Sequence, residues 1–398
     1  MSPRKTQALS HAGLLLNGSA PVATSANSRL DAIVVPTARP ASALLPVIKL
    51  SARLNVPLVI LCSRQAQLTQ VVDRVKRTFG ARALVVQVPD DYRPPCPAPL
   101  TSAERFQLAS AGRSSDLSAK RNIGLLLGRL RGWSKILFLD DDVYGFGPRD
   151  IGRLAGYLDR HPVASMASTK FPDNSVVCHA RRIVGFRQDV FVSGATLGVN
   201  LKHPELSFFA DVYNEDWFFF ARHAAERQLP RIGDALQQEY DPFADHERAA
   251  REEFGDLLAE GLYAELERGP ESFDEHLTAA TKPRLWRDFK DDRLQTIEET
   301  IQRLDRVGGR LDVVEYAKMK KSLDTANEWA NRISPELCAD FVDSWQQDET
   351  MWQKMLCNLP SGLSNRDALT ELQLSQWASC GYGLPAASET NFAAAGAV

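Results

Sequence analysis

Apolar runs alternate with amphipathic stretches in the first quarter of the chain. The pattern predicts, in order, a strand over 30–35 that ends at Pro36, a helix over 43–54, a strand over 57–62, a helix through Val71 and Val75, and a strand over 83–88. Strands that alternate with helices in this way are typical of a parallel sheet with helices on both faces. The fold class predicted from this pattern is α/β.

A fourth apolar run, over 136–139, predicts a buried parallel strand that ends in three carboxylates, Asp140, Asp141 and Asp142. Ligands of open α/β sheets bind at the carboxyl ends of the strands. Adjacent like charges repel one another, so we expect a cation near this strand end. Because side chains alternate along a strand, Asp141 is expected to point away from the site.

The region before this strand contains two segments of different composition. Residues 89–118 are rich in Pro, Ser and Asp and predict a long loop over the edge of the sheet. Residues 118–131 then predict a helix that carries a basic cluster, including Lys120 and Arg121. Taken alone, such a cluster indicates a solvated helix face. Its position immediately before the acidic strand favours a contribution to the site.

Further elements are predicted as a helix over 151–158, a short strand over 163–168 and an extended segment over 190–199. In the last of these, Ser193, Gly194 and Gly198 would let another group approach the backbone closely. A helix is expected to begin near Glu215 and Asp216, where the helix dipole favours acids. Acids in a first turn occur on many helices, so these two could also be no more than capping residues.

The pattern changes after about residue 245, where apolar positions at helical spacing predict amphipathic helices. We expect residues 269–384 to form a helical appendage without catalytic groups of its own. The termini, 1–29 and 385–398, are rich in Ser or Ala and are expected to be disordered.

Composition narrows the possible functions. The chain has 398 residues, 44% of them hydrophobic, and a formal net charge of −3, which gives no reason to expect nucleic acid or an anionic membrane as partner. Its six cysteines are scattered and favour neither a disulfide framework nor a zinc site. No stretch reaches the roughly 20 apolar residues of a membrane span. We expect a cytoplasmic protein without a transmembrane segment.

The two acidic segments suit one type of chemistry. When a nucleotide leaves a nucleotide diphospho-sugar, negative charge develops on the diphosphate, and a divalent cation held by carboxylates can neutralise it. The acceptor hydroxyl also needs a base, for which a carboxylate is suitable. Asp140 to Asp142 could supply the first function, and Glu215 with Asp216 the second.

Several segments together resemble a GT-A glycosyltransferase of the family 2 type. They are residues 33–39 (I-V-V-P-T-A-R), 120–124 (K-R-N-I-G), 138–142 (F-L-D-D-D), 193–195 (S-G-A) and Glu215-Asp216 with the following Arg222. The resemblance covers roughly residues 30–245 and is much more specific than an isolated D-x-D motif. It implies a Rossmann-like GT-A domain over 30–268, a nucleotide diphospho-sugar donor, a hydroxyl acceptor and Mn²⁺ or Mg²⁺ as cofactor.

The resemblance also implies roles for individual residues. The nucleotide pocket would contain Thr37, Arg39, Arg121, Asn122, Asp140, Ser193 and Gly194. Asp142 would be the direct metal ligand, with Asp140 near the ribose or the metal. Asp216 would be the catalytic base of an inverting enzyme, with Glu215 beside it at the acceptor. In related enzymes that retain configuration, such as glucosyl-phosphoglycerate and mannosylglycerate synthases, a downstream histidine is a metal ligand, and His246 could correspond to it.

Departures from the family pattern leave alternatives open. The acidic D-D-x-S segment that commonly contacts the base is replaced by residues 61–65 (L-C-S-R-Q), and the Q-x-x-R-W signature of processive synthases is missing. We therefore expect a single transfer to a small-molecule or carrier-bound acceptor. A phosphatase of the haloacid-dehalogenase type would use Asp140 as nucleophile, but Tyr144 replaces the threonine of its motif. A nucleotidyltransferase would need a glycine-rich loop after the first strand, and residues 36–42 contain no glycine. A nucleotide-sugar-binding module without catalytic activity is the remaining alternative.

Overall fold

The computed structural model describes residues 11–20, 28–172, 174–269, 271–382 and 389–391. Its strands are β1 (Leu15–Asn17), β2 (Ala32–Thr37), β3 (Leu58–Cys62), β4 (Arg82–Gln87), β5 (Lys135–Leu139), β6 (Val143–Tyr144), β7 (Val163–Ser168), β8 (Val192–Asn200), β9 (Leu229–Gln237), β10 (Trp377–Gly381) and β11 (Glu389–Asn391). The sheet has the order β1-β9-β7-β8-β5-β2-β3-β4-β10-β11, and β6 pairs with β9 off this path. Within the main path, β8 and β10 run antiparallel to their neighbours and the other neighbouring pairs are parallel. The prediction of an α/β fold with a mostly parallel sheet is confirmed.

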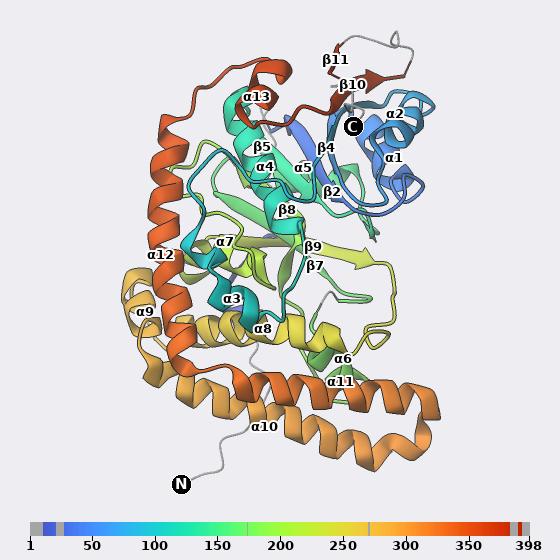
Figure 1. Cartoon of the computed structure of the whole chain (residues 1–398). Helices are drawn as coiled ribbons and strands as arrows, with labels where there is room; N and C mark the ends of the chain where they lie inside the picture. The colour runs from blue at the N-terminus through green and yellow to red at the C-terminus, as the bar shows by residue number, and fades with distance from the viewer. Residues whose placement is uncertain (1–10, 21–27, 173, 270, 383–388, 392–398) are drawn as a thin grey trace, which may run out of the picture.

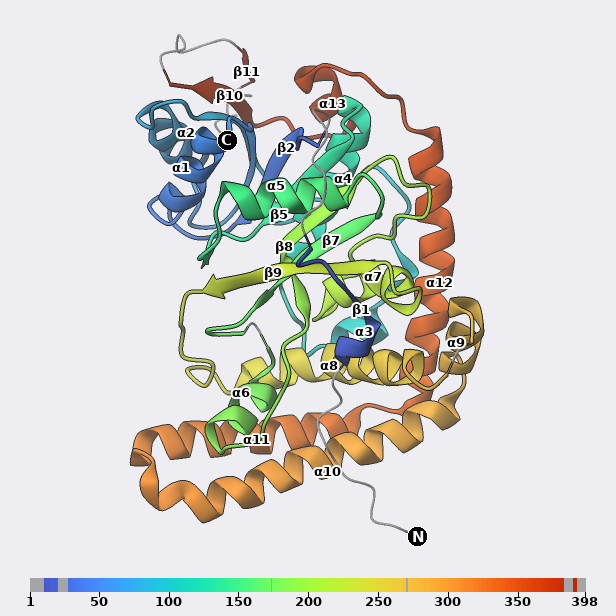
Figure 2. The same cartoon turned by 180° about the vertical axis from the view of Figure 1, so that it is seen from behind.

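Helices cover both faces of this sheet (Figures 1 and 2). They are α1 (Leu45–Leu54), α2 (Leu68–Lys76), α3 (Glu104–Ala109), α4 (Leu117–Arg131), α5 (Pro148–Tyr157), α6 (Val176–Ile183), α7 (Glu215–Ala225), α8 (Glu247–Leu266), α9 (Phe273–Ala280), α10 (Pro283–Val307), α11 (Val313–Arg332), α12 (Pro335–Asn358) and α13 (Asn365–Glu371), with short 3-10 helices at His11–Leu14, Leu100–Ser102 and Gly308–Arg310. Buried residues of α1, α2 and α5 pack on one face, and those of α4, α7, α8 and α12 on the other.

Strand β5 illustrates why the sheet is buried on both faces. Ile136 and Phe138 belong to the core beneath α4, whereas Leu137 and Leu139 belong to the core beneath α1, α2 and α5. All four side chains are at most 1% exposed. A strand that must be apolar on both sides reads as a continuous hydrophobic run, and this explains why the sequence pattern located it.

Strand β2 does not end at Pro36, as the sequence pattern predicted, but continues to Thr37, which pairs with Cys62 of β3. The backbone nitrogen of Ile33 donates to the carbonyl of Pro57, so the nitrogens of odd-numbered residues of β2 face β3. The nitrogen of Pro36 therefore faces β5, and the pairing with β5 ends at Val34. Proline is tolerated because no ladder hydrogen bond is needed from it there.

The prediction of disorder over 1–29 is wrong for part of the N-terminal segment. His11–Leu14 form a 3-10 helix, and β1 pairs in parallel with β9 at one edge of the sheet. Residues 1–10 and 21–27 lie outside the described residues. In the predicted disordered tail, Glu389–Asn391 form a strand that pairs with β10, and the flanking residues 383–388 and 392–398 are not described.

The predicted C-terminal helical region is present and packs closely on the sheet domain. Figure 1 shows α10 and α11 lying side by side at one end of the molecule, with α12 running along the side of the sheet toward α13 and β10. Phe218 of α7 contacts the rings of Phe341 and Trp345 of α12, with ring centroids 5.5 and 5.2 Å apart. Strand β10 then joins the sheet beside β4. The two parts of the chain therefore share one hydrophobic core.

Residues 89–118 form more structure than the predicted loop, because they contain a 3-10 turn and α3. The carboxylate of Asp348 in α12 accepts hydrogen bonds from the backbone nitrogens of Leu100 and Thr101 at 2.7 and 2.9 Å. The segment is thus held by the C-terminal helices. Within the residues described, no helix has the length and apolar character needed to cross a membrane.

Candidate functional site

A small pocket of about 100 Å³ lies where the carboxyl end of β5, the start of β8 and the first turn of α7 meet. Asp140, Arg121, Ser193, Glu215 and Asp216 are among its lining residues. Strand β8 is hydrogen-bonded beside β5, and the nitrogen of Asp140 donates to the carbonyl of Ala195 at 2.9 Å. The pocket therefore brings Asp140 together with Glu215 and Asp216, whereas Asp141 and Asp142 are not among its lining residues.

Arg121 is the centre of this pocket. Its Nη1 donates to Glu215 Oε1 at 2.5 Å, and its Nη2 lies 3.2 and 3.1 Å from the two carboxylate oxygens of Asp140. The side chain is 3% exposed. Burial opposes the charged form, but the carboxylates of Asp140, Glu215 and Asp216 raise the pKa of Arg121 above its usual value. The burial of Arg121 agrees with the expectation that this helix contributes to the site instead of presenting only a solvated face.

Gly194 allows Arg121 and Asp216 to approach the β8 backbone. A Cβ atom on Gly194 would lie 2.5 Å from Nη1 of Arg121 and 2.9 Å from Cβ of Asp216. The nitrogen of Gly194 donates to Oδ2 of Asp216, and the nitrogen of Trp217 donates to Oδ1 at 2.9 Å. Both carboxylate oxygens of Asp216 are thus oriented by the backbone. Gly198, by contrast, makes room for Leu154 in the core.

Asp141 is not among the residues that line the pocket. Its carboxylate accepts hydrogen bonds from Thr37 Oγ1 at 2.6 Å and from Arg39 Nε at 2.8 Å. Its expected orientation away from the site stays a prediction. Thr37 and Arg39, predicted as nucleotide contacts, therefore lie beside the acidic run, and their contact with a nucleotide stays a prediction.

Asp142 differs from its two neighbours in the groups that contact it. Gln237 Nε2 lies 3.4 Å from Oδ2 of Asp142, and the nitrogen of Gln238 donates to the Asp142 carbonyl at 3.0 Å. Asp140 and Asp141 are each bound by an arginine instead. The role of Asp142 as the direct metal ligand stays a prediction.

The structure does not bring His246 together with the acidic run as a ready ligand set. Across the described ranges, no three His, Cys, Asp or Glu side chains are grouped so as to hold a metal ion. His246 Nε2 lies 3.0 Å from Oε1 of the adjacent Glu247. Mg²⁺ is commonly held by only one or two carboxylates together with substrate phosphates. The residues at this strand end fit such a shared ion, whereas the ligand role of His246 stays a prediction.

Asn122 is used to position the backbone. Its Nδ2 donates to the carbonyl of Phe209 and its Oδ1 accepts from the nitrogen of Phe209, both at 2.8 Å. This pair of hydrogen bonds fixes the segment that leads to Glu215. The predicted contact of Asn122 with a nucleotide has no support from this geometry.

Lys120 has a role that the sequence reasoning missed. It is 1% exposed, and its Nζ donates to the Thr37 carbonyl at 2.8 Å and to Ser63 Oγ at 2.7 Å. It also pairs with Asp116 at 2.9 Å. Lys120 therefore ties together the segments that follow β2 and β3. The spacing of Asp116 and Lys120, one helical turn apart, was a signal that could have indicated this pair.

The C-terminal helices contribute to the site through Asn214, the residue before Glu215. Asn214 adopts a left-handed conformation with φ of 63°, and its Nδ2 donates to Asp256 Oδ1 at 2.9 Å. The other carboxylate oxygen of Asp256 accepts from Arg293 of α10 at 2.7 Å. Arg293 also binds Glu253 through two hydrogen bonds of 2.7 and 2.9 Å. A buried ionic network thus supports the turn that places Glu215 and Asp216.

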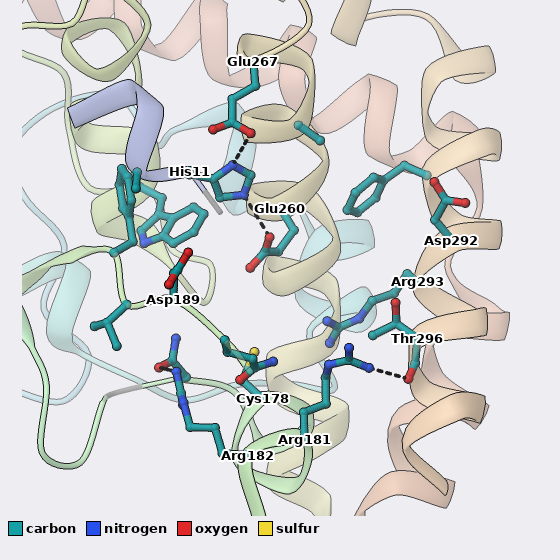
Figure 3. A pocket seen from close by; sticks show the side chains of 18 of the residues that line it. His11, Cys178, Arg181, Arg182, Asp189, Glu260, Glu267, Asp292, Arg293 and Thr296 are labelled. Atoms are coloured by element: carbon teal, nitrogen blue, oxygen red, sulfur yellow. Dashed lines mark hydrogen bonds and ion pairs between the residues drawn. The ribbon is translucent and has the colours of Figure 1, made fainter. Parts of the chain in front are cut away.

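A larger cavity of about 820 Å³ adjoins the pocket (Figure 3). The two spaces share the lining residues Asn174, Val190, Phe191 and Trp217. Since Trp217 directly follows Asp216, the cavity begins next to the predicted base. Nothing in the sequence pattern had indicated it.

The sequence matches no family model and no curated protein. Among solved structures, the chain is similar to the mannosyltransferase PcManGT from Pyrobaculum calidifontis, determined in complex with GDP-Man and Mn²⁺. The two chains are 11% identical, the match covers 83% of this chain and 90% of that chain, and the TM-score is 0.37. At that TM-score the match carries no weight, so the function is argued from the site itself.

Proposed function

We propose that the protein is a metal-dependent glycosyltransferase of the GT-A type, which moves a sugar from a nucleotide diphospho-sugar to an acceptor hydroxyl with inversion. The observation that supports this most is the bridge made by Arg121, which binds Asp140 at the end of β5 and Glu215 at the start of α7. It joins the acidic segment suited to a cation with the acidic segment suited to proton removal. Neither segment alone would distinguish a transferase from a simple cation site.

The two acids of α7 have different roles in this proposal. Glu215 is paired with Arg121 and lies 3.9 Å from Arg113, so its charge is already used to hold the site together. Asp216 lines the pocket, and the backbone nitrogens of Gly194 and Trp217 orient its carboxylate. In this proposal Asp216 is the base that accepts the proton of the acceptor hydroxyl, and Glu215 lies beside it at the acceptor.

The residues that would hold the cation are Asp142, with Asp140 and His246 as further ligands. When bound, Mg²⁺ or Mn²⁺ would supply neutralisation of the charge that develops on the departing diphosphate. Arg39 lies on the adjacent strand end, where its buried Nη2 has no hydrogen-bond partner among the described residues. That nitrogen suits a phosphate or ribose oxygen of the nucleotide. Ser193 and Gly194, at the start of β8, complete the donor side.

The phosphatase alternative loses support from the same geometry. Its nucleophile would be Asp140, which lines the pocket under either proposal. The second acidic motif would include Asp234, which lies in β9 and pairs with Arg231 at 2.7 Å on the surface. Asp234 does not line the pocket. An inactive binding module would have the same donor site and differs from a transferase only by lacking turnover.

The test of this proposal is calorimetry with a panel of nucleoside diphosphates, with and without Mn²⁺. We expect one member to bind at least about tenfold more tightly with Mn²⁺, and Asp142→Ala to remove that gain, because each tenfold step corresponds to about 1.4 kcal/mol and one charged contact supplies that much. Asp234→Ala is the matched control, since its carboxylate is exposed and outside the pocket. A gain from Mn²⁺ that persists in Asp142→Ala would contradict the proposed site.

A further inference from the structure

The cavity beside Asp216 is built by elements that the proposed donor site does not use. Its lining comes from the N-terminal 3-10 helix, from α6, α8 and α10, and from the segment before β8. Its volume of about 820 Å³ falls within the range of roughly 300–1,000 Å³ that is typical of small-molecule sites. It is therefore large enough for an acceptor the size of a sugar or larger.

One side of the cavity carries a histidine between two carboxylates. His11 lies between Glu260 and Glu267, with its Nε2 3.1 Å from the first and its Nδ1 3.3 Å from the second (Figure 3). The rings of Trp217 and Phe191 meet the imidazole edge to face, with centroids 5.5 and 6.2 Å away. This side therefore offers aromatic surface and, with His11 protonated, a net charge of −1.

The opposite side carries Arg181 and Arg182 of α6, and Figure 3 shows both guanidinium groups at the same end of the cavity. Arg181 is 3% exposed. Its Nη1 donates to the carbonyl of Thr296 at 3.2 Å and to Thr300 Oγ1 at 3.1 Å, while its buried Nε has no hydrogen-bond partner among the described residues. The charge of Arg181 is thus held in place by neutral groups.

Arg182 is also bound by a neutral group and also has a nitrogen without a hydrogen-bond partner among the described residues. Its Nη2 donates to Asn174 Oδ1 at 2.8 Å, and its buried Nη1 has no hydrogen-bond partner in the part of the chain that the structure describes. Within the same residues, neither Arg181 nor Arg182 forms an ion pair. Two arginines at the same end of one cavity therefore form no ion pair with a carboxylate of the described residues.

Other buried arginines of this protein do have such carboxylates. The pKa values of Arg121, Arg248 and Arg293 are raised despite burial, because nearby carboxylates stabilise the charged form. Burial instead lowers the pKa values of Arg181 and Arg182. An arginine remains charged in either case. The contrast shows that nearby carboxylates do not outweigh the desolvation of these two arginines: Glu299 favours the charged form of Arg181, but the effect of burial is larger.

The acidic residues that line the cavity do not form ion pairs with Arg181 or Arg182. Asp189, Asp288 and Asp292 are exposed to solvent, and Glu260 and Glu267 are bound to His11. An anion that entered the cavity would therefore find its partners at the α6 end. Guanidinium groups bind carboxylate and phosphate oxygens through short, charge-assisted hydrogen bonds.

We propose that this cavity binds the acceptor, and that the acceptor is an anionic hydroxyl compound whose phosphate or carboxylate group is held by Arg181 and Arg182. The aromatic side and Trp217 would contact its uncharged part, so that a hydroxyl group reaches Asp216. This inference rests on the proposed function for the identity of the ligand as acceptor. The binding of an anion by the two arginines does not depend on it.

The experiment uses the full-length protein and three probes with one carbon skeleton, namely glucose 6-phosphate, glucuronate and glucose, in calorimetric titrations. We expect glucose 6-phosphate or glucuronate to bind at least about tenfold more tightly than neutral glucose, and the better of the two identifies the anionic group. Arg182→Gln should abolish that preference. Arg181→Gln should also abolish the preference for the anionic probe. Arg181→Lys keeps the positive charge and should restore part of that preference, which a loss of packing alone would not explain.

Arg187→Gln is the matched control, because Arg187 follows α6, is exposed and does not line the cavity. Equal binding of the three probes to the unmodified protein would overturn the inference, and so would a preference that persists in Arg182→Gln or is lost equally in Arg187→Gln. Binding of a nucleoside diphosphate with Mn²⁺ is measured on the same samples. If it fails while the anion preference depends on Arg182, the proposed function falls and the anion site stands. If it succeeds without any anion preference, only the anion site falls.

Discussion

Gly194 gives the sharpest test of the candidate site, because one methyl group there would collide with two of its residues. A Cβ atom would lie 2.5 Å from Nη1 of Arg121 and 2.9 Å from Cβ of Asp216. Arg121 is tied to Asp140 and Glu215, and Cβ of Asp216 is next to its own backbone, so neither can yield easily. To regain ordinary contact distance the guanidinium must move by about 1 Å, and a displacement of that size can lower turnover about 100-fold.

The same substitution should also destabilise the protein, since an added methyl group in a packed region costs about 1–3 kcal/mol. Gly198→Ala separates the two effects. Gly198 lies on the same strand, and a Cβ atom there would lie 2.3 Å from Leu154 Cδ2 and 2.9 Å from Leu158 Cδ1, which belong to the core and not to the site. We therefore expect both variants to lower the Tm and Gly194→Ala alone to lose turnover.

The assay measures the nucleoside diphosphate released from a nucleotide sugar at saturating donor, with thermal unfolding followed by circular dichroism on the same samples. Turnover by Gly194→Ala within about threefold of the unmodified protein would refute the steric reasoning. An equal loss in Gly198→Ala would show that general destabilisation, and not the position of Arg121 and Asp216, limits activity.

Two further predictions follow from the site and the cavity. If Asp216 is the base, Asp216→Asn should lower kcat about 100- to 10,000-fold while nucleoside diphosphate affinity is kept, and NMR should show an inverted anomeric product; retention of configuration would contradict this role and favour the retaining type of transferase. Burial of His11 opposes its charge, but Glu260 and Glu267 raise its pKa from 6.5 to about 9. The stability it contributes, on the order of 3 kcal/mol, should be complete below its unfolded pKa of about 6.5 and lost as the pH rises through about 9. The Tm of the unmodified protein should thus fall more steeply than that of His11→Gln between about pH 7 and pH 9.5, and parallel curves would contradict the pairing.

The elements that were not predicted from the sequence lack a long periodic pattern. Helix α6 has 8 residues, which is too short for a helical period to stand out. Strand β9 contains Pro230 and Gly233, which usually argue against a strand. The N-terminal segment owes its structure to two distant partners, because β1 pairs with β9 and His11 lies between two acids of α8. Such contacts leave no trace in the local pattern.

The sequence by itself determined the α/β class and the positions of the acidic strand end and of Glu215 and Asp216. These features are local, since a strand buried on both faces is continuously apolar and a first helical turn favours acids. Only the tertiary structure decided how they are used. It placed Arg121 between Asp140 and Glu215, and it gathered α6, α8 and α10 around a cavity lined by Arg181 and Arg182, which form no ion pair among the described residues. Ion pairs and cavities of this kind depend on strand register and helix packing between segments distant in the chain, which no local pattern encodes.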